Sequence, residues 1–226
     1  ISDPAYRGVQ QIPTETLQRM VRTVASKGMQ FTAHSVGDAA VATLLGVYEE
    51  VSRELPLRDT RPCITHCNFM SPDSIAKAAR VGAVIDLQPI WFHLDGATLL
   101  KQFGEERLKR FQPLRALFDA GVPVGVNVAP IIPGLNDAEL PEIMERAREA
   151  GASHAAYILL RLPGPVAGIF EQRLRAALPL RAEKVLARIR EVRGGGMNDA
   201  RFGHRMRGEG VYADTIHALF TRTARR

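Results

Sequence analysis

The stretch GVPVGVNVAPIIPGLND, residues 121–137, decides the fold class of this chain. Val122–Ala129 is a short apolar run rich in valine, which favours a buried strand. Gly121 ends the helical pattern before it, and Pro133-Gly134 turns the chain toward the next helical pattern. Helix, strand and helix in this order are one repeat of a parallel βα fold.

Outward from this stretch, four more apolar runs have the length of buried strands: Met29–His34, Cys63–His66, Ala83–Gln88 and Ala155–Leu162. The helical patterns between them are Thr14–Lys27, Gly37–Glu54, a helix opened by Ser71-Pro72 and ended by Gly82, Gln112–Ala120, Asp137–Ala150, Val166–Leu178 and Arg181–Arg190. Right-handed crossovers then give an α/β fold. The prediction is a partial (β/α) barrel or an open parallel sheet of about five strands with flanking helices.

The composition is that of an ordinary globular protein, with 46% hydrophobic and 24% charged residues in a chain of 226. No apolar run reaches the roughly 18 residues of a membrane span, so no membrane contact is expected. Two cysteines indicate a cytoplasmic protein without a disulfide framework. The net charge of +6 comes mainly from the C-terminal segment, which is either a nucleic-acid contact or a solvated basic tail.

Two histidines stand where strands end. His34 closes the first apolar run and His66 closes the second. The carboxyl ends of parallel strands meet at one edge of the sheet, where βα folds build their sites. Strand alternation places His34 on one face with Thr32, and His66 on one face with Ile64. The pair is therefore a candidate divalent-metal site, with two hydrogen-bonded core histidines as the alternative.

The two cysteines flank His66. Cys63 and Cys67 have the spacing C-x-x-x-C, but alternation turns both away from His66. An iron–sulfur cluster needs three or four cysteines, so none is expected and both cysteines are interpreted as structural.

The phrases AHSVGDAAV, RPCITHCNF, GAVIDLQPIW and FGEERLKRFQPLRALFDAGVPV carry a family resemblance. Residues 1 to about 124 resemble the amidohydrolase superfamily, in particular the amidohydrolase 3 group. That resemblance implies a (β/α)₈ barrel that hydrolyses C–N bonds of small-molecule amides or cyclic ureides with metal-activated water. It gives His34 and His66 the places of the metal-binding histidines of the fifth and sixth strands, with Zn²⁺ as the expected ion.

The chain departs from that family at two points. It contains no H-x-H pair, and Asn127 in NVAP stands where the family has an aspartate. An amide cannot accept the proton of metal-bound water as a carboxylate can, so no catalytic residue is assigned. We expect a remnant of a hydrolase that is weak or inactive as it stands.

The second part of the chain carries another resemblance. The phrases VGVNVAPIIPGLNDAEL, YILLRLPGPV and IREVRGGGMNDARFGHRMRGEGVYA, within residues 121–224, are similar to radical SAM proteins related to spore photoproduct lyase. That resemblance implies that Pro130, Ile132, Gly134 and Asp137 pack the adenine of S-adenosylmethionine. The three-cysteine cluster motif of those enzymes is missing, so reductive cleavage has no electron source.

Basic residues in this part offer weaker signals. Arg161 ends the fifth apolar run and is either a carboxylate or phosphate contact or a member of an ion pair. His204, Arg205 and Arg207 lie among glycines, in a loop that either contacts a polyanion or packs against the fold.

The sequence thus predicts two segments, an amidohydrolase-like half-barrel at residues 1–120 and a radical SAM-like segment at 121–226. Recombination, design and an assembly error would each produce such a junction at Ala120–Val124. Three functions stay open: a hydrolase-derived metal protein, a module that binds S-adenosylmethionine or nucleic acid without a cluster, and a non-functional join of two gene fragments.

Overall fold

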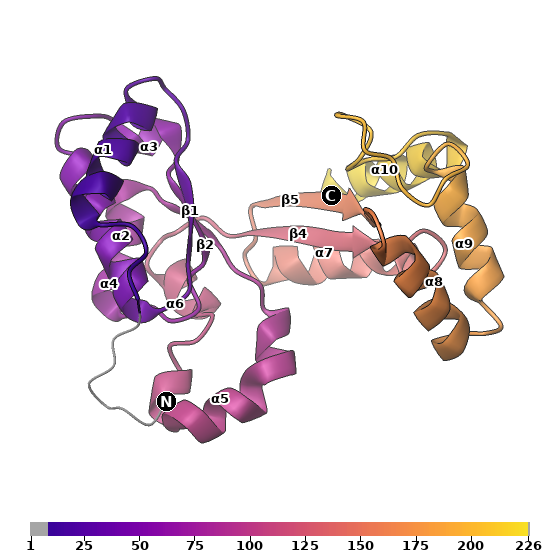
Figure 1. The fold of residues 1–226 in the computed structure, drawn as a ribbon, viewed down its shortest axis with the longest axis horizontal. Helices are drawn as coiled ribbons and strands as arrows, with labels where there is room; N and C mark the ends of the chain where they lie inside the picture. The colour runs from indigo at the N-terminus through magenta and orange to yellow at the C-terminus, as the bar shows by residue number, and fades with distance from the viewer. Residues whose placement is uncertain (1–8, 226) are drawn as a thin grey trace. The chain divides into compact units, whose positions relative to one another are not determined.

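The computed structural model of the chain describes residues 9–225 (Figure 1). The chain divides into two compact units, Ile1–Val122 and Pro123–Arg226. Each unit has its own parallel sheet and its own hydrophobic core. Within the described residues the sheets have three and two strands and neither closes into a barrel, which confirms the predicted open α/β class.

The first unit is built on three parallel strands, β1 (Thr32–Ser35), β2 (Cys63–His66) and β3 (Val84–Asp86), in that spatial order. His34 is in register with Thr65, and Thr65 with Asp86. In the described part of this unit, residues 9–122, six helices accompany the sheet: α1 (Thr14–Ala25), α2 (Asp38–Val51), α3 (Leu57–Thr60), α4 (Pro72–Val81), α5 (Ile90–Leu108) and α6 (Leu114–Asp119).

Helix α2 forms the centre of the first core, packed between α1 and α4. Its apolar side chains Leu44, Leu45 and Val47 are almost fully buried. Tyr48 is also buried, and its hydroxyl donates a 2.9 Å hydrogen bond to the carbonyl of Cys63. Each such side chain contributes about 1.5–3 kcal/mol by leaving water, so α2 fixes the strands that carry the histidines.

The bounds of α4 follow from its sequence. The hydroxyl of Ser71 accepts a 3.1 Å hydrogen bond from the backbone N–H of Ser74, and Pro72 occupies the first helical position. Gly82 ends the helix with a φ of 69°, a left-handed conformation that glycine adopts without strain. The predicted start and end of this helix are confirmed.

The second unit contains the parallel pair β4 (Gly125–Ile131) and β5 (His154–Leu159), with a register shift between Val128 and Ile131. Its helices are the 3₁₀ turn η1 (Asp137–Glu139), α7 (Leu140–Glu149), α8 (Val166–Ala177), α9 (Ala182–Glu191) and α10 (Val211–Ala224). Helices α7 and α10 pack on the sheet around Ile131 and Leu159, while α8 and α9 share a separate apolar cluster.

All five predicted strands are present, although they form two sheets and not one. Three helices were not predicted from the sequence: α3, α5 and α10. In residues 9–225 no helix combines the length and the apolar character that crossing a lipid bilayer requires.

Candidate metal centre

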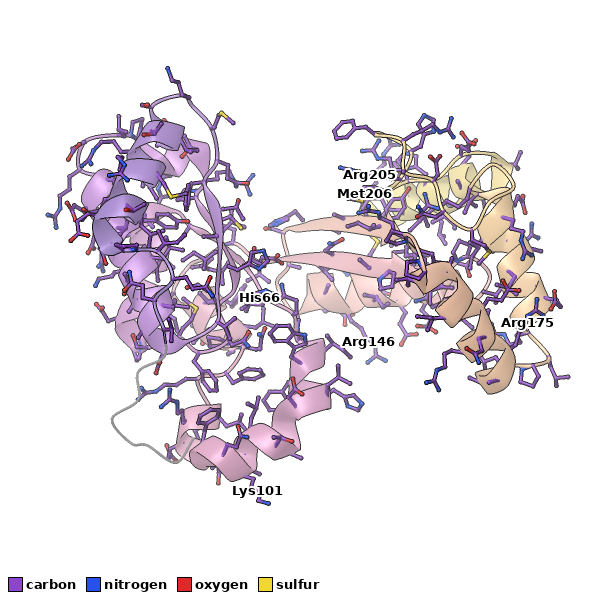
Figure 2. All side chains as sticks on the ribbon, viewed as in Figure 1. His66, Lys101, Arg146, Arg175, Arg205 and Met206 are labelled. Carbon is purple, nitrogen blue, oxygen red and sulfur yellow. The ribbon has the colours of Figure 1, made fainter. Side chains whose placement is uncertain are left out.

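The two strand-end histidines of the first unit lie in contact. Nδ1 of His34, on β1, is 2.8 Å from Nε2 of His66, at the end of β2 (His66 is labelled in Figure 2). Their ring centroids are 4.8 Å apart with the ring planes at 47°. The predicted convergence of these two side chains at one edge of the sheet is therefore what the structure shows.

The way His66 reaches this position differs from the expectation. Ile64 is completely buried in the core, so strand alternation alone would also direct His66 toward the core helices. The backbone of His66 has a φ of 83° and that of Cys67 a φ of 42°, both left-handed conformations. The predicted shared face of Ile64 and His66 is wrong, because this backbone turn rotates the His66 side chain toward His34.

Gln88 fixes the chemical state of the pair. Its Oε1 is 2.8 Å from Nδ1 of His66, and its Nε2 donates a 3.0 Å hydrogen bond to the carbonyl of Asp86, which orients the amide. An amide oxygen only accepts, so Nδ1 of His66 carries the proton. The lone pair of His66 Nε2 is then the one that faces His34.

A second glutamine holds Gln88. The Oε1 of Gln112 accepts a 3.0 Å hydrogen bond from the backbone N–H of Gln88, and its Nε2 donates to Asn68 at 3.1 Å. Gln112 is buried, with a left-handed φ of 49°. Trp91 stacks on His66 with ring centroids 4.9 Å apart and planes at 19°. The imidazole of His66 is thus fixed on two sides.

This arrangement suits a divalent ion in part. Two nitrogens bound to one tetrahedral zinc, at about 2.0–2.1 Å each, are roughly 3.3 Å apart, only slightly farther than the observed 2.8 Å. A metal-bound histidine usually donates its other N–H to an oxygen acceptor, as His66 does to Gln88. Two ligands are fewer than the three or four that protein zinc sites supply, so the site is incomplete.

The cysteines do not add to these ligands. Cys63 and Cys67 are free and buried, and burial is the first cause that raises the pKa of both thiols, that of Cys67 to about 12. Thiols in that state are poor metal ligands and poor nucleophiles. Their interpretation as structural residues agrees with this burial.

In the second unit, the loop predicted to bind the cofactor, residues 130–137, is held by hydrogen bonds among its own residues. Asn136 accepts from the backbone N–H of Ile132 at 2.7 Å and donates to the carbonyl of Pro130 at 3.1 Å. Asp137 accepts from the N–H of Gly134 at 2.9 Å and from the hydroxyl of Tyr212. The turn expected here is present, and a role in S-adenosylmethionine binding stays a prediction.

Arg161 is exposed just beyond β5, and the oxyanion contact proposed for it from the sequence also stays a prediction. Its neighbour in space, Arg193, was not predicted as a functional residue from the sequence. Arg193 is 4% exposed and donates to the carbonyls of Leu160 at 2.6 Å and His204 at 3.1 Å. It anchors the loop after α9 to the end of β5, and no short sequence pattern marks this long-range contact.

That loop holds a group of ligand-type side chains that was not predicted from the sequence either. Asp199, His204 and Glu209 each place one ligand atom within 4.8 Å of the others. Arg201 lies among them, 2.7 Å from the carboxylate of Asp199 and 2.9 Å from that of Glu209. Its hydrogen bonds lower the pKa of Asp199 to about 2. This Arg201 network is an ion-pair network with its cation already in place.

Comparison with known proteins assigns the first part of the chain. Residues 2–135 match the amidohydrolase family. The candidate amidohydrolase YtcJ of Bacillus subtilis (strain 168) is 30% identical over 132 residues, and the protein LONG AFTER FAR-RED 3 of Arabidopsis thaliana is 28% identical over 107. These stretches cover 58% and 47% of this chain. No solved structure gives a significant match.

The chain belongs to the amidohydrolase family. It spans only 24% and 18% of the lengths of these two relatives. The family match continues past Ala120–Val124 into β4. The radical SAM resemblance and the junction inferred from it therefore stay predictions.

Proposed function

We propose that His34 and His66 bind one divalent metal ion, with zinc as the expected ion, as part of an amidohydrolase-type site. The reaction class is hydrolysis of a C–N bond in a small-molecule amide or cyclic ureide. The observation that carries this proposal is the hydrogen-bonded series Gln88, His66 and His34, which presents an unprotonated imidazole nitrogen toward a second imidazole.

Each residue of this series has a distinct role. Gln88 keeps the proton of His66 on Nδ1, so Nε2 is the acceptor that faces Nδ1 of His34 and would coordinate an ion in place of that hydrogen bond. Trp91 covers one face of the His66 ring and excludes water from it. A bound ion would supply activated water and polarise the substrate carbonyl.

Weak or absent turnover is part of the proposal. In residues 9–225 the one group of three or more ligand-type side chains is the Arg201 network, which does not include His34 or His66. No carboxylate hydrogen bonds to either imidazole in the described part of the chain, so a general base is missing from the pair. Metal binding, not turnover, is therefore the property that tests the site.

The test uses the single tryptophan of the chain, Trp91, which stacks on His66. Co²⁺ bound to the pair should quench Trp91 fluorescence with a stoichiometry of about one, and Zn²⁺ should reverse the quenching by competition. His34→Ala and His66→Ala should abolish both effects. His93→Ala removes an exposed histidine of the same unit and should leave them unchanged. Undiminished binding by both His34→Ala and His66→Ala would refute the proposal.

A further inference from the structure

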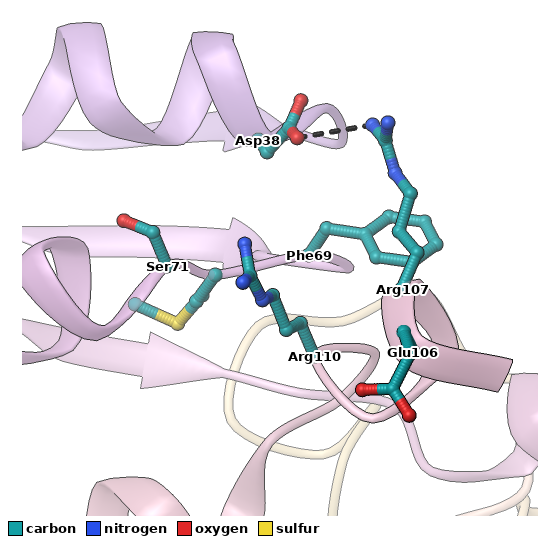
Figure 3. A pocket seen from close by; sticks show the side chains of 7 residues that line it. Asp38, Phe69, Ser71, Glu106, Arg107 and Arg110 are labelled. Atoms are coloured by element: carbon teal, nitrogen blue, oxygen red, sulfur yellow. Dashed lines mark hydrogen bonds and ion pairs between the residues drawn. The ribbon is translucent and has the colours of Figure 1, made fainter. Parts of the chain in front are cut away.

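A cavity of about 300 Å³ lies within the first unit beside the loops that follow β1 and β2. Asp38 lines it from the start of α2, and Phe69, Met70 and Ser71 line it from the segment between β2 and α4. The remaining wall is the end of α5 and the residues after it, Glu106, Arg107 and Arg110. The cavity thus places two guanidinium groups near the carboxyl edge of the sheet (Figure 3).

Arg107 is held in a fixed position. Its guanidinium lies 3.0 Å from the carboxylate of Asp38, and it stacks over the rings of Phe69 at 5.5 Å and Phe103 at 5.2 Å. A guanidinium restrained by an ion pair and two aromatic faces loses little further entropy when it binds a ligand.

Arg110 forms the other wall, and its backbone is tied to the opposite side of the cavity. Its carbonyl accepts a 3.2 Å hydrogen bond from the N–H of Met70, and the next residue, Phe111, forms a β-bridge with Phe69. Within residues 9–225 no carboxylate oxygen lies within ion-pair distance of its guanidinium. The side chain therefore offers its donors to the cavity.

The two carboxylates that line the cavity are already paired. Asp38 is bound to Arg107, and Glu106 is bound to Lys109 at 2.6 Å, a contact that lowers the pKa of Glu106 below its usual value. In Figure 3 the Arg110 guanidinium points to the side of the cavity where Asp38 and Arg107 lie, whereas the Glu106 carboxylate points the opposite way. Both lining carboxylates thus have a cation partner, whereas the lining cation Arg110 has no ion-pair partner in residues 9–225, so its positive charge is left for the cavity.

We propose that the cavity between Arg107 and Arg110 binds the oxyanion group, a carboxylate or a phosphate, of a small-molecule ligand. The planar guanidinium fork matches the two oxygens of either group, and Phe69 and Met70 provide apolar contact for the part of the ligand next to the oxyanion. This site does not require a metal at the histidine pair.

The test measures binding of three probes to the full chain by ligand-observed NMR, with a chelator present so that no metal ion holds the anion. N-acetylglycine carries a carboxylate, N-acetylglycinamide is its neutral counterpart, and inorganic phosphate supplies the other oxyanion. Binding of N-acetylglycine over its amide assigns a carboxylate ligand, and binding of phosphate alone assigns a phosphate ligand. Equal binding of the acid and the amide, or no binding of either anion, overturns the proposal.

Two substitutions should shift the affinity in opposite directions. Arg110→Gln should weaken oxyanion binding about tenfold, because a charge-assisted hydrogen bond is lost, and Arg110→Lys should retain part of it. Asp38→Asn keeps the shape of the cavity and releases Arg107, so it should tighten binding about fivefold. A gain of affinity cannot result from misfolding.

The matched controls are Arg115→Gln and Asp119→Asn on α6. These residues form a similar ion pair, with a nitrogen–oxygen distance of 2.9 Å, and Arg115 also lies over an aromatic ring, that of Phe118. Neither residue lines the cavity. Unchanged affinity in both controls supports a specific site, whereas losses in Arg115→Gln equal to those in Arg110→Gln show a diffuse charge effect and reject it.

Discussion

The histidine pair of the first unit and the Arg201 network of the second both bring metal-ligand side chains together. They differ in the groups that surround those side chains. In the pair, two imidazoles meet at 2.8 Å, with an amide and an indole around them. Two carboxylates and an imidazole surround the guanidinium of Arg201 instead. The pair therefore leaves a place for a cation, while the network already contains one.

The difference shows that the number of ligand-type residues alone does not identify a metal site. The Arg201 network has three candidate ligands and the histidine pair has two. The state of the neighbouring groups decides: Gln88 directs the lone pair of His66 toward a second neutral ligand, His34, whereas a cation, Arg201, occupies both carboxylates. Each half of this comparison can be changed by substitution.

The largest effect is expected when the built-in cation is removed. In a chain that carries His34→Ala and His66→Ala, Arg201→Ala should raise the Zn²⁺ affinity of the Arg201 network by about a hundredfold, because two carboxylates become free and a positive charge is lost. Isothermal titration calorimetry measures this gain directly.

Arg205→Ala in the same background is the control, since Arg205 belongs to the same loop (labelled in Figure 2) and stacks on Phe202 without an ion pair to these carboxylates. Equal Zn²⁺ affinities of the Arg201→Ala and Arg205→Ala chains would show that Arg201 does not exclude a metal ion.

A smaller effect is expected at the oxygen acceptor behind the histidine pair. Gln88→Leu removes the acceptor for Nδ1–H of His66, so the proton is no longer held on Nδ1 and can move to Nε2. This change should weaken Co²⁺ binding about ten- to hundredfold. Gln88→Glu keeps an oxygen at this position and should bind at least as tightly as the parent chain. Trp91 quenching gives all the affinities.

Gln102→Leu, the same substitution at an exposed position of α5, should change nothing. A Gln88→Leu chain with parental Co²⁺ affinity would remove the basis for giving Gln88 this role.

Much of this arrangement could be predicted from local patterns. The strand end at His66, the end of β1 one residue after His34 and the helix stop at Gly82 follow from apolar runs and from glycine chemistry within a few residues. Helix α5 was missed because none of its residues is buried, so no apolar stripe marks it, and Gly104 interrupts it with non-helical φ and ψ angles.

The contacts that complete the sites depend on distant segments. Gln112 reaches Asn68 from 44 residues away, and the left-handed backbone at His66 exists only where the surrounding core imposes it. Likewise, Arg193 holds the loop that carries the Arg201 network at the end of β5, because its guanidinium reaches the carbonyl of Leu160 from 33 residues away. Short-range periodicity contains no information on such contacts, and for this reason the sequence identified ligands but not the groups that orient them.

The smallest effect concerns the protonation of the Arg201 network. The pKa of Asp199 is lowered from its ordinary 3.8 to about 2, first through the hydrogen bond from the Arg201 side chain and then through its backbone N–H. A folded-state pKa below the unfolded value stabilises the fold at pH values above about 4, and this stabilisation is lost as the pH falls toward 2. The thermal unfolding midpoint of Asp199→Asn should therefore lie below that of the parent chain at pH 5, and the two should converge near pH 2.

Carboxyl NMR should show Asp199 titrating near pH 2 in the parent chain and close to 4 in Arg201→Met. A parent Asp199 carboxyl that titrates near 4 would mean that Arg201 does not stabilise its ionised form. The view that the Arg201 network differs from the histidine pair by containing a cation would then be supported only by the distances in the two sites.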